Sequence, residues 1–67
     1  MEVYKKVRTY IEKNGYKQSA VARKTGIPDA AFGAMMNGSR TMYADDLRAV
    51  CLALNVSPEV FLDTSNG

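Results

Sequence analysis

Residues 18–38 of the chain, QSAVARKTGIPDAAFGAMMNG, hold the strongest structural pattern in the sequence. Small or apolar residues recur here at the spacing of two short helices on either side of a tight turn. Gly26 can supply the left-handed backbone that ends the first helix, and Pro28 cannot continue that helix. The residues expected to point inward are Val21, Ala22, Thr25, Ile27, Phe32 and Met35. The stretch is therefore predicted to form a helix-turn-helix, with helices over about 18–25 and 28–37.

The second helix of this motif is predicted to present one strip of residues to the outside. With Phe32 and Met35 held inward at i and i+3, the helical wheel turns a set of mostly small side chains outward. The members of this outward strip are Asp29, Ala30, Gly33, Ala34 and Asn37. The outward strip is the candidate recognition surface.

The stretch resembles the helix-turn-helix of the XRE family, which comprises phage repressors, Cro proteins and their bacterial relatives. The resemblance extends from about Val7 to Phe61. The matching residues are Gln18, Ala22, Gly26, Ile27, Phe32, Met35 and the pair Asn37-Gly38. It implies an all-α fold, a compact five-helix bundle of the lambda repressor-like type. It also implies a sequence-specific DNA-binding transcriptional regulator that represses by occupying promoter DNA.

The flanking sequence supplies the other helices of such a bundle. Apolar residues at helical spacing predict one helix over 2–13 and another over about 43–54. Ser57-Pro58-Glu59 is a helix start signal, a cap followed by proline at the first helical position, and it predicts a short last helix. Residues 63–67 are expected to form a frayed tail. Since no linker or repeat divides the sequence, a single domain over residues 1–67 is expected.

The XRE resemblance implies that two groups of residues hold DNA phosphates while the outward strip meets base edges in the major groove. The phosphate candidates are Lys17, Gln18, Ser19, Asn37, Ser39, Arg40 and Thr41, and the base-facing candidates are Asp29, Ala30, Gly33 and Ala34. The base-facing set offers one carboxylate and no arginine, glutamine or asparagine. Bidentate hydrogen bonds to guanine or adenine are therefore not available from the centre of the strip.

Structural roles compete with these assignments. Helix capping is the alternative for Gln18, Ser19, Asn37 and Asp29, and a solvated loop charge is the alternative for Arg40. The small residues of the strip, together with Met36, could instead dock a helix of another protein. The alternative function is thus a helix-turn-helix scaffold repurposed as a protein–protein interaction module.

Four positions depart from the family pattern or need a specific packing. Lys17 stands where relatives have a serine or threonine cap. Relatives often place an arginine and a glutamate at the positions of Ile11 and Met36, where they form a partly buried ion pair. Replacing such a pair by packed apolar side chains is commonly neutral or stabilising, so we predict that Ile11 and Met36 touch. Tyr16 is expected to bury its ring where the chain enters the motif.

Members of the family generally bind two half-sites about 34 Å apart as two-fold dimers. A homodimer, at least on DNA, is therefore the expected assembly. The apolar residues available for it near the carboxyl end are Leu54, Val56, Val60 and Phe61. Filling the core is the competing role of these four side chains.

The charge of the chain is small but unevenly distributed. The 67 residues include nine basic and seven acidic side chains, a net charge of +2. Residues 1–28 carry seven basic side chains against two acidic ones, whereas residues 29–67 carry two against five. This polarity predicts a basic end on the folded domain, as binding to a phosphate backbone requires. A lopsided but merely solvated surface is the alternative.

The composition argues against an enzyme. The sequence contains no histidine and a single cysteine, Cys51, so it offers neither an imidazole-based catalytic triad nor a cluster of metal ligands. No glycine-rich phosphate loop occurs, and no apolar run approaches the roughly 20 residues of a membrane span. We expect no cofactor, no small-molecule substrate and no membrane partner. Double-stranded DNA is the expected partner, in the cytoplasm of a bacterial or phage-encoding host, associated with the nucleoid.

Overall fold

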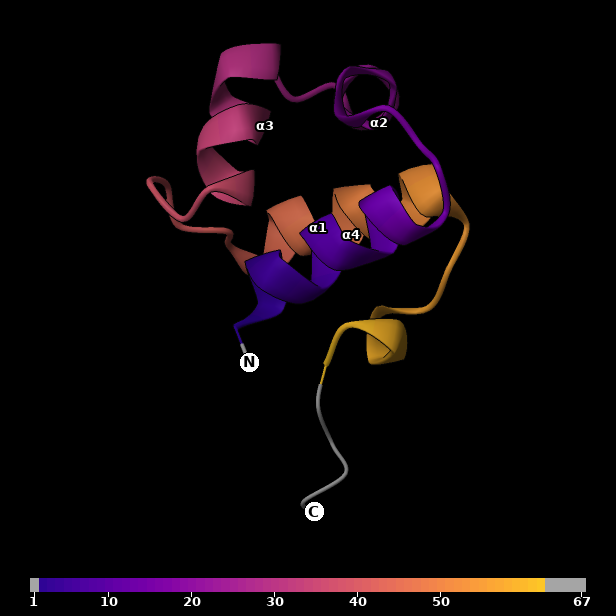
Figure 1. The fold of residues 1–67 in the computed structure, drawn as a ribbon. Helices are drawn as coiled ribbons and strands as arrows, with labels where there is room; N and C mark the ends of the chain where they lie inside the picture. Colours follow the sequence, from indigo (N-terminus) through magenta and orange to yellow (C-terminus); the bar gives the residue numbers. More distant parts are fainter. Residues whose placement is uncertain (1, 63–67) are drawn as a thin grey trace.

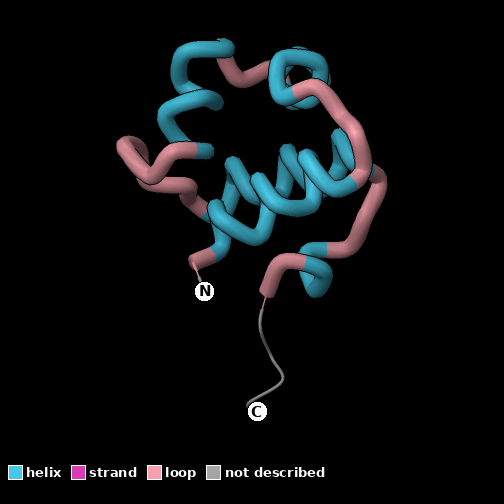
Figure 2. The backbone as a smooth tube through the Cα atoms, in the orientation of Figure 1, coloured by secondary structure: helices cyan, strands magenta, loops and turns pink. Residues whose placement is uncertain are grey.

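The computed structural model describes residues 2–62. Within this range the chain forms four α-helices, one short 3-10 helix and no β-strand (Figures 1 and 2). In chain order the elements are α1 (Val3–Lys13), α2 (Gln18–Thr25), α3 (Asp29–Met36), α4 (Ala44–Leu54) and η1 (Pro58–Val60). The predicted all-α class is confirmed. The tail predicted over residues 63–67 lies outside the described residues.

The predicted count of five helices is wrong, because η1 extends over only three residues. Its start signal is used as expected: the Glu59 N–H donates to Ser57 Oγ at 3.4 Å, and Pro58 occupies the first helical position. A start signal does not make a helix propagate, since each further residue must favour the helical state. Phe61 is the C-cap residue of η1, and Leu62 after it is not helical.

The helix-turn-helix formed by α2 and α3 packs on the other elements through one apolar core. α2 contacts both α3 and α4, α1 contacts α3, and η1 contacts α4. In Figure 1, α2 and α3 lie above α1 and α4, and η1 lies below them. The buried side chains are Val7, Ile11, Val21, Ala22, Phe32, Met35, Met36, Val50, Cys51, Leu54 and Phe61. All six residues predicted to point inward from the motif are buried or half-buried.

The turn between α2 and α3 is held by backbone conformation and by one hydroxyl group. Gly26 ends α2 with a φ of +81°, in the left-handed region that glycine adopts without a Cβ clash. Thr25 Oγ1 donates a hydrogen bond to the Ala22 carbonyl at 2.6 Å and accepts one from the Ile27 N–H at 3.0 Å. The hydroxyl therefore links the last turn of α2 to the chain entering α3.

Ile11 and Met36 lie in the same core, on helices that pack against each other. Their exposed fractions are 3% and 2%, so both apolar side chains are buried. The Arg8 guanidinium, three residues before Ile11, donates to the Met36 carbonyl at 3.0 Å. These facts agree with the predicted neighbourhood of the two residues, while direct contact between the two side chains stays a prediction.

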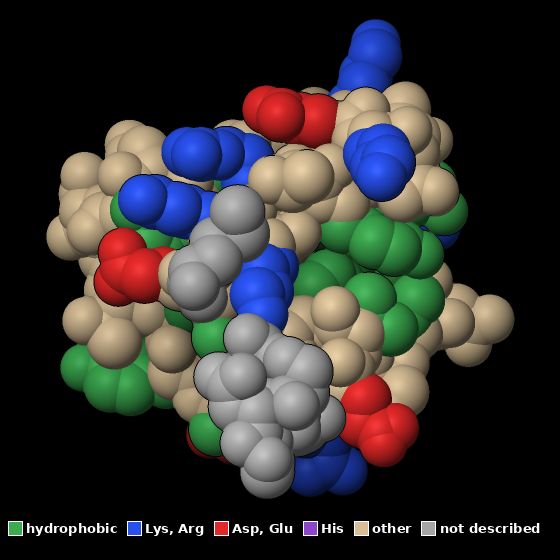
Figure 3. Space-filling view, turned by 60° about the horizontal axis from the view of Figure 1, so that its bottom comes forward, with side chains coloured by type: hydrophobic (Ala, Val, Ile, Leu, Met, Phe, Trp, Pro, Cys, Tyr) green, Lys and Arg blue, Asp and Glu red, His purple; other side chains and the backbone are tan. Residues whose placement is uncertain are grey.

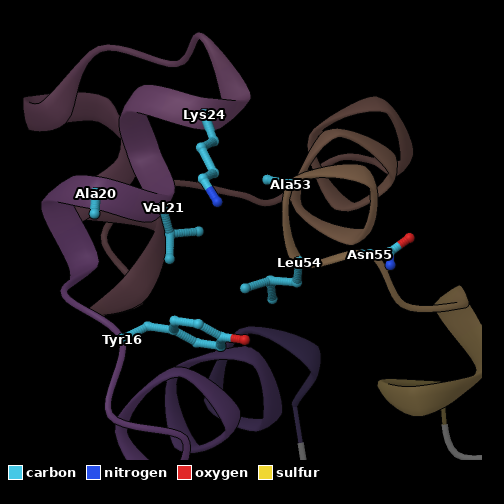
Figure 4. A pocket seen from close by; sticks show the side chains of 7 residues that line it. All are labelled: Tyr16, Ala20, Val21, Lys24, Ala53, Leu54 and Asn55. Carbon is cyan, nitrogen blue, oxygen red and sulfur yellow. The ribbon is translucent and has the colours of Figure 1, made fainter.

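The prediction that Tyr16 buries its ring is wrong, since 48% of the residue is exposed. Its backbone N–H donates to the Ile11 carbonyl at 3.0 Å, which fixes the chain between α1 and α2. The core position beside it is filled by Val21 and Leu54. The tyrosine ring lines the edge of a hollow between α2 and α4, where its hydroxyl can stay hydrated (Figure 4).

Cys51 lies in the core with 3% of its surface exposed. Burial raises the pKa of the Cys51 thiol above its usual value, because the charged thiolate loses its hydration. Cys51 therefore behaves as a small hydrophobic side chain.

Candidate nucleic-acid interface

The outward strip of α3 is only partly open. Asp29, Ala30 and Asn37 are exposed, whereas Gly33 and Ala34 are half-buried. Two neighbouring segments lie beside Gly33 and Ala34, namely the beginning of α2 and the loop that follows α3. The phosphate candidates belong to these same two segments, so the structure brings them to the borders of α3.

The loop after α3 folds back onto the carboxyl end of the helix. The N–H groups of Ser39 and Arg40 donate to the Ala34 carbonyl at 2.9 and 3.1 Å, which satisfies a carbonyl that the helix leaves without an internal partner. The Ser39 N–H also donates to Asn37 Oδ1 at 2.9 Å. The backbone of the loop is thereby fixed, while the side chains of Ser39, Arg40 and Thr41 are exposed.

The beginning of α2 forms the second border of α3. Lys17, Gln18 and Ser19 are all exposed, and Lys17 is the N-cap residue without a side-chain cap hydrogen bond. The missing cap predicted at Lys17 is thus confirmed. The first N–H groups of a helix have no intrahelical partner and carry the positive end of the helix dipole. They are suited to binding an anionic oxygen.

The side chain of Gln18 extends from α2 to the middle of α3. A Cβ atom built on Gly33 would lie 3.8 Å from Gln18 Nε2, an ordinary van der Waals contact. The carboxamide therefore lies over the glycine of the outward strip. Neither the helical spacing of α2 nor that of α3 could have revealed this contact, because it depends on how the two helices cross.

Asp29 does not cap α3. Pro28 is the N-cap residue, and Asp29 is the first residue with helical geometry. The carboxylate lies in the first turn, where it interacts favourably with the helix dipole. It is the only charged side chain of α3.

Two residues of α1 that were not predicted as part of the site lie beside the loop. A Cβ atom built on Gly38 would lie 2.7 Å from the Tyr4 hydroxyl oxygen. The Arg8 guanidinium carbon lies 5.9 Å from the centroid of the Tyr4 ring. The same guanidinium group donates a hydrogen bond through Nη1 to the Met36 carbonyl. Tyr4 and Arg8 are spaced i, i+4, but only the packing of α1 on α3 shows that this pair supports the loop.

The predicted basic end is not one continuous patch. Arg8 and Arg40 lie near the carboxyl end of α3, whereas Lys6 and Lys13 line a hollow on another side, together with Thr9, Tyr10, Val60 and Phe61. Figure 3 looks toward the η1 side of the molecule and shows several lysine and arginine side chains on that face. α1 distributes its basic residues around its axis, so they cannot all face one ligand. Lys24 lines yet another hollow, between α2 and α4 (Figure 4).

Met36 does not contribute to an outer docking surface, because only 2% of it is exposed. The proposal that Met36 and the small residues of the strip together dock a partner helix is therefore wrong for Met36. Within residues 2–62, no three His, Cys, Asp or Glu side chains are grouped closely enough to hold a metal ion. None of the helices in the same range is long and apolar enough to cross a membrane.

A comparison with models of protein families gives a match to the Cro/C1-type HTH DNA-binding domain over residues 6–65. The chain belongs to this family. Comparison with curated proteins and with solved structures gave no match. In this Cro/C1-type domain, α2 and α3 are the two helices of the helix-turn-helix, and the XRE resemblance inferred from residues 18–38 is confirmed.

Substituting alanine for Gly38 is expected to destabilise this Cro/C1-type domain by more than the same substitution at Gly15. Both glycines have a positive φ, +86° and +74°, so a side chain costs about 1–2 kcal/mol of backbone strain at either position. Only at Gly38 does the new Cβ also meet the Tyr4 hydroxyl, whereas nothing lies within 4 Å at Gly15. Urea denaturation of the two variants measures the difference, and equal losses would mean that Tyr4 does not support the loop.

Proposed function

We propose that this protein is a transcriptional repressor that binds promoter DNA sequence-specifically, with α3 in the major groove and the whole chain acting as one DNA-binding domain. The observation that supports this proposal best is that polar residues border α3 on two sides. The Gln18 carboxamide lies near Gly33, and the loop over 38–41 is hydrogen-bonded to the Ala34 carbonyl. A helix with so little charge can approach a groove closely while its neighbours bind the backbone.

The phosphate contacts come from these two borders. At the amino end of α2, the free backbone N–H groups and the exposed side chains of Lys17, Gln18 and Ser19 face one phosphate. Beyond α3, the exposed side chains of Asn37, Ser39, Arg40 and Thr41 face another. Arg40 supplies the charge of this second group. The base-facing positions are Asp29, Ala30, Gly33 and Ala34, of which Asp29 can accept a hydrogen bond from a cytosine amino group.

Two copies of the protein bind the two half-sites of an operator in this proposal. Of the four apolar residues considered for the contact between copies, Leu54 and Phe61 are in the core and Val56 is half-buried. Val60, 50% exposed, is the only one of the four that is largely available to a second copy.

The salt dependence of binding to a duplex of generic sequence tests the proposal. The logarithm of the binding constant should fall linearly with the logarithm of the salt concentration, because phosphate contacts release condensed counterions. Arg40→Ala should weaken binding to all sequences alike and reduce the magnitude of this slope by about one. The matched control is Arg48→Ala, an exposed arginine on α4, which packs against α2 and η1.

Fluorescence anisotropy with a labelled duplex gives both the binding constant and the slope. No detectable binding at low salt would contradict the proposal, and so would an unchanged slope for Arg40→Ala. Selection from random-sequence duplexes should then recover a palindrome whose half-sites are about one helical turn apart. A family of unrelated sequences would argue against sequence-specific repression.

A further inference from the structure

α3 offers few groups that can distinguish one base pair from another. Its exposed or half-exposed outward residues up to position 34 are one aspartate, one glycine and two alanines. Asn37 could contribute an amide, but its Oδ1 already accepts a hydrogen bond from the Ser39 N–H. Alanine methyl groups can touch a thymine methyl but cannot form a bidentate pair with guanine or adenine. Direct readout by α3 alone is therefore limited to Asp29 and apolar contacts.

The Gln18 side chain supplies the missing type of group. It begins on α2, and its Nε2 lies 3.8 Å from the position of a Cβ on Gly33. Gln18 is exposed, and no hydrogen bond from its side chain to the described part of the protein holds it in place. A carboxamide with both its oxygen and its NH2 group free lies beside the centre of the outward strip.

A small residue at position 33 leaves room for the carboxamide. A Cβ at position 33 would lie 3.8 Å from Gln18 Nε2, an ordinary contact distance, so an alanine would leave the carboxamide in place as well. A longer side chain at position 33 would extend into the space now taken by Gln18 Nε2. A residue no larger than alanine at position 33 therefore leaves the surface of α3 open to a side chain from another helix.

We propose that Gln18 determines base specificity: its carboxamide, lying over Gly33, reads a base edge in the major groove in place of a side chain from α3. This inference rests on the proposed function and changes one of its assignments: the Gln18 side chain meets a base edge, while the side chains of Lys17 and Ser19 keep the phosphate. The preferred base is adenine, whose N6 donor and N7 acceptor match the two ends of a glutamine carboxamide. The backbone N–H groups of Gln18 and Ser19 remain available to a phosphate, because they do not depend on the direction of the Gln18 side chain.

The test compares the base preferences of variants by random-sequence duplex selection with sequencing. The wild type should prefer adenine at one position of each half-site, by about tenfold over the other bases. Gln18→Ala should lose that preference and keep the preferences at other positions. Gln18→Glu leaves only acceptors at this place and should shift the preference to cytosine, whose N4 group is a donor.

Two variants at Gly33 test whether the position of the Gln18 side chain over α3, and not only its presence, determines the base preference. Gly33→Leu keeps Gln18 but fills the space over position 33, so it should also abolish the preference for adenine. Gly33→Ala adds a Cβ at an ordinary contact distance and should keep it. Ser19→Ala, a neighbouring change at the same end of α2, should weaken binding to all sequences without altering any preference. Circular dichroism of each variant verifies that it is folded.

The outcomes distinguish this inference from the function on which it rests. If the wild type binds DNA with the expected salt dependence but Gln18→Ala keeps every preference and only weakens binding uniformly, the side chain contacts a phosphate and the inference is overturned. A wild type that binds with no base preference would overturn it as well. If no salt-dependent binding occurs at all, the proposed function itself fails.

Discussion

Phe32→Ala should lower the free energy of unfolding by about 3–5 kcal/mol, the usual cost of removing a fully buried phenylalanine ring. Phe32 is 0% exposed and is one of the two largest fully buried side chains among the described residues, the other being Phe61. A chain of 67 residues has a total stability of about 3–10 kcal/mol, so the variant loses much or all of it. α3 has eight residues, too few to persist as a helix without tertiary packing. Urea denaturation followed by circular dichroism measures the loss.

Leu52→Ala provides the control for this prediction. Leu52 is also a large apolar residue within a helix, but 74% of it is exposed. Its truncation should change the stability by no more than about 0.5 kcal/mol, since it creates no cavity. A loss below about 1 kcal/mol for Phe32→Ala would mean that α3 is not anchored through this ring.

Ala30→Glu should abolish DNA binding while leaving the fold intact. Ala30 is exposed on the outward strip, and glutamate is a good helix former, so little change in stability is expected. In the proposed complex the new carboxylate enters a groove walled by phosphates, and such juxtaposition of like charges costs several kcal/mol. The affinity should therefore fall by about 100-fold or more. Anisotropy titration at fixed salt, together with a denaturation curve, measures both properties.

The matched control for Ala30→Glu is Thr9→Glu. It adds the same charge at an exposed position on the side of α1 that lines the hollow with Val60 and Phe61. The general loss of positive charge is identical in the two variants, so only their location differs. Similar affinities for the two would show that α3 does not face the DNA.

The helix-turn-helix could be predicted because its signals are local. Gly26 marks the end of α2 by a backbone conformation that other residues adopt only with strain, and it was found with a φ of +81°. The inward spacing of Phe32 and Met35 follows from the period of a single helix, and both are fully buried. The length of η1 was not predictable in this way, because a cap and a proline mark where a helix begins and not where it ends.

The features that the sequence did not reveal depend on how separate helices cross. The Gln18 carboxamide approaches position 33 of α3 at a point that neither helical periodicity identifies. The exposure of Tyr16 depends on the packing of Val21 and Leu54, which occupy the core beside it. Similarly, most basic side chains lie in residues 1–28, but those on α1 point in different directions around the helix and so lie on different faces of the domain.

The position of Glu2 determines where the protein can be labelled without disturbing DNA binding. Glu2, Val3 and Tyr4 line the same surface hollow as Gly38, Arg40 and Thr41. An affinity tag or fluorophore fused before Glu2 would begin beside the proposed phosphate-binding loop. A polyhistidine tag there could compete with or add to the contacts of Arg40. A dye coupled to the new thiol of a Leu52→Cys variant would lie at an exposed position of α4 that does not line this hollow.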